Sequence, residues 1–345
     1  MTPHTTRPTG QRPPPRSRST PAPSALDPAP GTNEPGARHA DRDRGSARAA
    51  RSASPVAFVG VSAHEPAEHL FRALLAAYLA GADEFLIRES PTVSEATREV
   101  ARTFCRRTFG PEILSEGEGV LRLRDLSAEG FVPLERRVAR MGRAVVELHR
   151  QAIESWSALP LREDGVWAGR DDEVDREAWC IERCLGRDPS ATLDPGRLLG
   201  LFTVTRSLER IADHAVGLGE EGRRLAGTPS SSLPVGLLRR FHRQAMDHLE
   251  GALAARDASR ANELLDTGEA LTASGRALAD RLLPAVHGEA VPPTTVAAVA
   301  RILDSILRTI AYAQDIAEVA LDRVPVAELG DRRARPSRAP LASAA

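Results

Sequence analysis

Beyond Phe131, apolar side chains recur every three or four residues over most of the chain, which is the spacing of one buried helical face. Two segments, 171–185 and 194–225, have this spacing, and Asp194 followed by Pro195 is typical of a helix start. The segment before them carries one continuous apolar stripe, made of Leu134, Val138, Met141, Val145, Leu148, Ala152 and Trp156. Three helices of this length with short connections predict a three-helix bundle over residues 131–228.

The same pattern of three helices returns in residues 234–323, which indicates an internal duplication of roughly a hundred residues. Aligning the two third helices pairs Ser207 with Ser305 and Arg210 with Arg308 without a gap. Further pairs in the same alignment are Ala215 with Ala313, Leu218 with Ile316, and Glu220 with Glu318. The sequence therefore predicts two tandem three-helix bundles.

Residues 56–128 follow a different pattern, in which short apolar runs alternate with two amphipathic segments. The runs "VAFVGV", "EFLIRE", "EILSE" and "VLRLRDL" are typical of strands. The longer segments "EPAEHLFRALLAAYLAGA" and "TVSEATREVARTFCRRTFG" are typical of helices. This small α/β module has no Gly-rich phosphate loop, no catalytic carboxylate pair and no Ser/His combination. We expect it to serve interaction or oligomerisation, and we expect the protein to be a homo-oligomer.

Both ends of the chain, residues 1–55 and 330–345, lack any hydrophobic period and are rich in Pro, Arg, Ser and Ala. Segments of this composition cannot bury enough apolar surface to fold, so we expect both tails to be disordered. The predicted fold class is mostly α: two tandem three-helix bundles, preceded by a small α/β module and a disordered N-terminal tail.

Composition narrows the classes of function. The formal net charge of −1 gives no general attraction to nucleic acid or to an anionic membrane. No apolar run approaches the ~20 residues of a membrane span, and the N-terminus has no apolar segment of a signal peptide. We therefore expect no membrane insertion. The cysteines, Cys105, Cys180 and Cys184, form neither a zinc pattern nor a disulfide framework, which fits a reducing cytoplasm.

Two pairs of carboxylates are the candidate chemistry of the first bundle. Glu209 and Asp213 lie one turn apart beside the apolar face of "RSLERIADHAVGL", and Asp171 and Asp175 have the same spacing in "DDEVD". Such pairs on facing helices can converge on a hard or borderline metal ion. His214 turns toward a different face, so we do not count it among the ligands.

The spacing alone leaves two explanations without a metal open. The acidic run 171–173 would begin a helix, where acidic side chains interact favourably with the helix dipole. Alternatively, Glu209 and Asp213 could pair with Arg206 and Arg210 of their own helix. Catalysis is not expected, because di-iron oxidases of helical bundles use Glu-x-x-His pairs, and this sequence contains none.

The duplicated bundles with "LERIADHA" in the third helix resemble the PhoU family of phosphate-uptake regulators. The family pattern is an acidic residue, three others and an Asp on two helices of each bundle, and "DDEVD" and "ERIAD" match it. The stretches "AAYLAGADEFLI" and "SILRTIAYAQDIAEVAL" resemble the archaeal-type branch, in which a small module precedes two tandem PhoU domains. The likeness covers roughly residues 65–323.

The resemblance implies a cytoplasmic, non-enzymatic regulator of phosphate uptake and phosphate-responsive signalling. Such a protein would be a helical adaptor on the ATPase of a phosphate ABC transporter or on a sensor histidine kinase. The resemblance also implies a site for Fe, Zn, Mn or Mg formed by Asp171, Asp175, Glu209 and Asp213. The matching positions of the second bundle hold Gly268, Thr272, Leu307 and Ala311, so we expect metal in the first bundle only.

The alternative function is a DNA-binding transcriptional regulator, which would use the α/β module and the Arg-rich tail. Relatives of the archaeal-type branch often begin with a swapped-hairpin DNA-binding module. Residues 1–55 show no strand pattern that could form one. Nucleic acid is therefore not the partner that we expect first.

Overall fold

The computed structural model describes residues 56–60, 66–127, 133–156, 166–187, 194–225, 235–288 and 291–322. The predicted tails lie outside these residues. The elements, in chain order, are β1 (Val56–Gly60), α1 (Ala67–Leu79), β2 (Glu84–Arg88), α2 (Glu95–Arg107), β3 (Pro111–Gly117), β4 (Val120–Asp125), α3 (Leu134–Ser155), α4 (Val166–Arg187), α5 (Pro195–Leu225), α6 (Val235–Ala254), α7 (Ala258–Gly288) and α8 (Pro293–Asp322).

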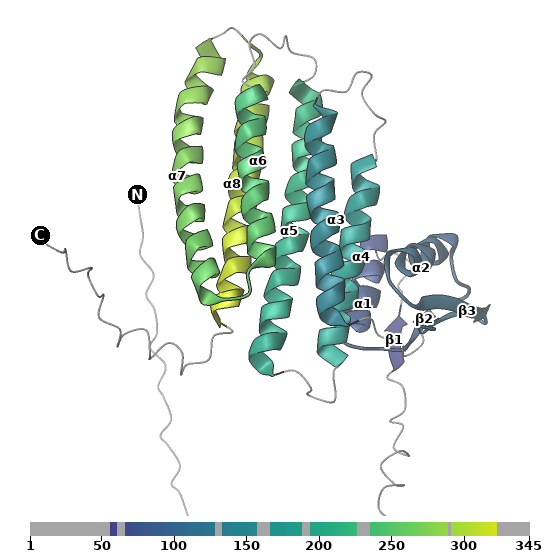
Figure 1. Cartoon of the computed structure of the whole chain (residues 1–345). Helices are drawn as coiled ribbons and strands as arrows, with labels where there is room; N and C mark the ends of the chain where they lie inside the picture. The colour runs from purple at the N-terminus through teal and green to yellow at the C-terminus, as the bar shows by residue number, and fades with distance from the viewer. Residues whose placement is uncertain are drawn as a thin grey trace, which may run out of the picture. The chain divides into compact units, whose positions relative to one another are not determined.

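Six long helices, α3 to α8, lie side by side and make up most of the described chain (Figure 1). Their buried apolar side chains form one continuous core that draws on all six helices. The predicted stripe of the first helix is confirmed, because Val138, Met141, Val145, Leu148 and Ala152 are all buried in that core. The predicted mostly α fold, with helical bundles after a small α/β module, is confirmed.

The two sets of three helices pack against each other along their third helices, α5 and α8. Glu221, which is buried near the end of α5, forms an ion pair with the exposed Arg301, near the start of α8 (Nε to Oε1 2.6 Å). His214, earlier in α5, stacks on Tyr312, later in α8, with the ring centroids 5.9 Å apart. The two helices therefore run antiparallel, and the two sets of three helices share a single core.

The α/β module has its own apolar core. Its sheet has the strand order β1-β2-β4-β3, with β1 parallel to β2 and the other neighbours antiparallel. The alternation predicted for "VLRLRDL" is present in β4, where Leu121 and Leu123 are buried and Arg122 and Arg124 are exposed. Helix α2 begins after Ser94, whose hydroxyl accepts a hydrogen bond from the Thr97 amide.

One helix starts earlier than the sequence pattern suggests. Helix α4 begins at Val166, so the acidic run 171–173 lies beyond the first turn, and the first turn of α4 holds no acidic residue. The explanation of this run as a helix-dipole interaction is therefore wrong, because that interaction fades within the first turn.

A buried histidine pair joins α3 to α6. The Nε2 atom of His149 lies 3.0 Å from the carbonyl oxygen of Ile211, and its Nδ1 atom lies 3.1 Å from Nε2 of His242. Since a carbonyl only accepts, Nε2 of His149 carries a proton, and in the neutral ring Nδ1 accepts from Nε2 of His242. Burial favours the neutral form of both rings. Burial lowers the pKa of His149 to about 3, with a further contribution from His242, and lowers the pKa of His242 to about 4.

We expect this pair to make the protein sensitive to acid. Both pKa values lie below the unfolded value near 6.5, so the unfolded chain binds more protons than the folded chain once the pH drops below that value. The stabilising effect of the neutral pair is complete above about pH 6.5 and is lost as the pH falls toward 4. At pH 4.5 the loss should be on the order of 5 kcal/mol for the two rings together.

The measurement is urea unfolding at pH 7.5 and 4.5 for the parent and for His149→Leu with His242→Leu. Buried carboxylates with raised pKa values act in the opposite direction, but they are the same in both proteins. The double variant should therefore lose less stability than the parent between the two pH values. Equal losses would show that the pair does not govern the acid response.

Candidate functional site

The structure places the four predicted carboxylates on two helices that pack together. Asp171 and Asp175 come from α4, and Glu209 and Asp213 from α5. We call these four residues the acidic cluster. Its members are unequally exposed: the side chains of Asp175 and Glu209 are each 17% exposed, whereas that of Asp213 is 45% exposed.

Burial and mutual repulsion both act on the acidic cluster. Burial raises the pKa of Asp171 to about 6, and the charges of Asp213, Asp172 and Glu209 add to the effect. Burial likewise raises the pKa of Asp175 to about 7, with a further contribution from Asp171. The pKa of Glu209 is raised for the same reason, although Arg206 opposes the rise. The carboxylates are therefore close enough to repel one another, and a cation between them would be stabilising.

Arginines supply positive charge next to the cluster. The guanidinium of Arg206 lies 3.6 Å from Glu209, and that of Arg210 lies 3.6 Å from Asp213. These two pairs are the ones expected from helical spacing. A third arginine comes from elsewhere in the chain: Arg107, at the end of α2 in the α/β module, lies 2.8 Å from Asp175. Sequence reasoning missed Arg107, because no regular spacing connects residues 107 and 175.

The donors of the acidic cluster have the right chemistry for a metal ion, but their arrangement does not fit one. In the described part of the chain, no group of three or more His, Cys, Asp and Glu side chains is placed so that it could hold a metal. One oxygen of Glu209 is buried without a hydrogen-bond partner. The carboxylates face arginines rather than a common point.

His214 and the cysteines are not members of the acidic cluster. His214 is half-buried against Tyr312 of α8, as expected for a residue on a different face from the carboxylates. Cys180 is buried, Cys184 is half-buried, and both are free thiols. Burial, together with a hydrogen bond to Cys184, raises the pKa of Cys180. This thiol is therefore protonated at neutral pH.

In the second half, the residues that align with the acidic cluster include Gly268 and Leu307, which take part in helix packing. A Cβ atom at Gly268 would lie 2.6 Å from the side chain of Gln314, so the absence of a side chain lets α7 approach α8 closely. Leu307 packs against the shared core. The first half alone has the two carboxylate pairs.

The α/β module is anchored on α4 by a buried arginine, Arg183. Its guanidinium donates to Asp125 at 2.8 Å and to Asp83 at 3.0 Å, and it also contacts the carbonyl oxygen of Tyr78. The same guanidinium lies 4.4 Å from the centroid of the Tyr78 ring. Arg187, one turn later, adds a second ion pair to Asp83. These contacts fix the module to the helix that carries half of the acidic cluster.

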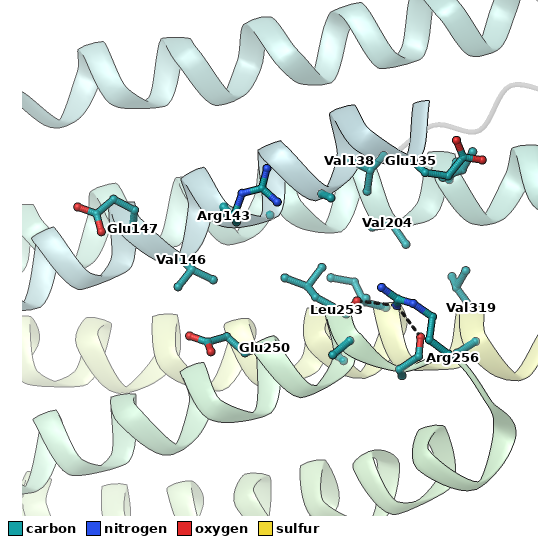
Figure 2. Close-up of a pocket in the computed structure, with 18 residues that line it drawn as sticks. Glu135, Val138, Arg143, Val146, Glu147, Val204, Glu250, Leu253, Arg256 and Val319 are labelled. Carbon is teal, nitrogen blue, oxygen red and sulfur yellow. Dashed lines mark hydrogen bonds between the residues drawn. The ribbon is translucent and has the colours of Figure 1, made fainter. Parts of the chain in front are cut away.

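A groove of about 670 Å³ lies between the two halves, and α3, α5, α6 and α8 line it (Figure 2). Val138, Val146, Leu253 and Val319 give it an apolar lining. Charged side chains that also line it are Glu135, Arg143, Glu147, Glu250 and Arg256. The lining residues of this groove include no Ser, Cys or His, so the groove offers no nucleophile or general base of these types.

The fold and the acidic cluster define a class: a helical-bundle protein with carboxylate pairs in its first three long helices and an α/β module docked on them. Residues 138–221 match the family described as the PhoU domain. This match spans α3, α4 and most of α5, and it therefore includes all four residues of the acidic cluster.

Two solved structures are similar to this chain. The phosphate transport system regulatory protein PhoU from Streptococcus pneumoniae has 18% sequence identity and a TM-score of 0.50, over 55% of this chain and 91% of that chain. PhoU from Pseudomonas aeruginosa has 20% identity and a TM-score of 0.43, over 55% of this chain and 93% of that chain. A comparison with curated proteins found no match. In the described residues, no helix is both long and apolar enough to cross a membrane.

Proposed function

We propose that this protein regulates phosphate uptake and phosphate-responsive signalling, as an archaeal-type relative of PhoU with two tandem PhoU domains. The PhoU domain match over residues 138–221 is the observation that carries the proposal. The likeness in fold to the phosphate transport system regulatory protein of Streptococcus pneumoniae supports it. The duplicated buried positions in the second half support the tandem arrangement, since Leu238, Phe241, Ala245 and Ala252 repeat the α3 pattern in α6.

In this proposal the protein is a non-enzymatic adaptor in the cytoplasm. Its helical surfaces would bind the ATPase of a phosphate ABC transporter or a sensor histidine kinase and favour one of the partner's conformations. The shared core of the two halves supports this role, because it gives the partner a rigid surface with few internal degrees of freedom.

The test is a pull-down with the tagged full chain from phosphate-replete and phosphate-starved cells, followed by mass spectrometry. We expect a phosphate transporter ATPase or a sensor kinase to be enriched in the phosphate-replete sample. Affinity for duplex DNA over a salt series separates this function from transcriptional regulation. A regulator of transport should bind DNA weakly and without sequence preference. Tight, sequence-specific DNA binding without enrichment of either partner would contradict the proposal.

We further propose that the acidic cluster binds a divalent or trivalent cation, with Fe, Zn, Mn and Mg as the candidates, after its side chains rearrange from their positions in this structure, which hold no metal-binding group of three. The four clustered carboxylates support this proposal, since burial and mutual repulsion raise the pKa values of Asp171 and Asp175. A bound ion would offset the repulsion among the carboxylates and stabilise the folded state.

Changing Glu209→Gln together with Asp213→Asn should abolish metal binding and the metal-dependent rise in Tm. The measurements are metal content of the purified protein and thermal melts with and without each ion. Asp315→Asn is the matched control, because Asp315 is a carboxylate of α8 in the second half, outside the acidic cluster. We expect this control to behave like the parent. A double variant that keeps its full metal content would contradict the site.

A further inference from the structure

The groove between α3, α5, α6 and α8 has two different ends (Figure 2). Val138 of α3 and Val319 of α8 lie at one end, which we call the apolar end. Glu147 of α3 and Glu250 of α6 lie at the other end, and Arg143 lies between the two. Because a helix rises 1.5 Å per residue, the stretch of α3 from Val138 to Glu147 gives the groove a length of about 14 Å.

Two charged side chains of the groove are available to a ligand. In the described part of the chain, neither Arg143 nor Glu250 forms an ion pair, and both residues are exposed. Glu147, by contrast, pairs with Arg150 of its own helix. A ligand that brings an acid to Arg143 and a base to Glu250 would therefore gain two ion pairs above an apolar floor.

Helix α8 brings the chain to the apolar end of this groove. Val319 and Ala320 line the groove, and α8 ends at Asp322. The sequence "VPVAEL", residues 324–329, follows almost at once and lies outside the described residues; we call it the C-terminal segment. Pro325 favours an extended backbone for the residue before it, and six extended residues reach about 20 Å. The C-terminal segment is therefore long enough to follow the groove from end to end.

The order of side chains in this part of the sequence matches the order of the groove lining. The two valines of the C-terminal segment come first, next to the apolar end. Glu328 follows, and the groove offers Arg143 beyond its apolar end. The run 331–335, with three arginines against one acidic residue, comes last, and the far end of the groove offers Glu250. Both the apolar and the charged positions are thus complementary.

We propose that the C-terminal segment is the intramolecular ligand of this groove, with Glu328 beside Arg143 and the basic run 331–335 beside Glu250. Weak contacts are enough, because the short connection to α8 gives the segment an effective concentration in the millimolar range. Any other peptide with an apolar face has to displace the segment before it binds the groove. The inference depends neither on the proposed function nor on a metal ion.

The test is fluorescence anisotropy with a labelled peptide of residues 323–338, titrated with the full-length protein. Val324→Asp together with Val326→Asp should release the segment and leave the groove open. This variant should bind the peptide about tenfold more tightly than the parent, as expected for a millimolar effective concentration against a Kd of about 0.1 mM. Ala342→Asp with Ala344→Asp is the matched control, because it adds the same charge beyond the basic run. This control should bind the peptide like the parent.

Charge reversal locates the contact within the groove. Arg143→Glu, added to the open-groove variant, should weaken peptide binding, and Glu328→Arg in the peptide should restore it. Arg136→Glu is the matched control, because Arg136 is exposed on α3 and is not among the residues that line the groove. This control should leave peptide binding unchanged.

Equal peptide binding by the parent and the open-groove variant would overturn the inference. Absence of binding by every protein at millimolar concentration would also overturn it. A loss of binding in Arg143→Glu that Glu328→Arg in the peptide does not restore would overturn the assigned position of the segment.

Discussion

Met141→Asp should lower the free energy of unfolding by about 4 kcal/mol or more, because it places an unpaired charge in a well-packed interior. Met141 has no exposed surface and lies in the core that the six long helices share. A carboxylate at this position has no described cation on the inner stripe of α3 with which to pair. Urea unfolding followed by circular dichroism measures the loss.

Ala139→Asp is the matched control for this change. Ala139 is exposed on the same helix, two residues earlier, so a carboxylate there stays hydrated. We expect a change in stability of no more than about 0.5 kcal/mol. If Met141→Asp were as stable as this control, the inner stripe of α3 would not be buried as described.

Arg183→Leu should detach the α/β module from α4 and cost about 3–5 kcal/mol, the usual range when one partner of a buried ion pair is removed. The side chains of Arg183 and Asp125 are each 5% exposed, so the variant leaves a buried carboxylate without its main partner. Hydrogen exchange in α1 and β4 should rise sharply, while α5 and α8 keep their protection.

Two further variants separate lost pairing from general damage. Arg170→Leu removes an exposed arginine of the same helix that pairs with the exposed Glu173, and it should have little effect. Adding Asp125→Asn to Arg183→Leu should restore part of the lost stability, since the buried charge is then removed. Identical damage in the single and the double variant would show that the arginine acts through packing alone.

The helical part of this fold could be predicted because each stripe is encoded locally. The spacing from Val138 to Ala152 reports burial directly, and the structure buries those positions. The start of α4 at Val166 is not predicted, because the sequence pattern places the start of this helix at the acidic run 171–173. Helical spacing predicts that Asp171 lies beside Asp175 and that Glu209 lies beside Asp213. The predicted three-helix bundle places these two pairs on helices that pack together.

No pattern in the sequence predicts the contacts between residues that are far apart in the chain. Arg107 meets Asp175 and Arg183 meets Asp83 only because the module folds back onto α4, and no sequence period relates these residues. The His149–His242 pair is equally invisible, since each histidine simply occupies one more position of an apolar stripe. Side-chain pairs within one helix could thus be predicted from the sequence, whereas contacts between different helices and strands depend on how these elements pack.

The antiparallel packing of α5 on α8 also determines how the protein responds to dilution. The two halves are segments of one polypeptide, so each meets the other at a fixed local concentration, however few copies a cell contains. A pair of separate subunits with the same interface would come apart at low abundance. Covalent linkage removes that dependence, and it leaves each half free to differ in sequence, as Glu209 and Asp213 in α5 differ from Leu307 and Ala311 in α8.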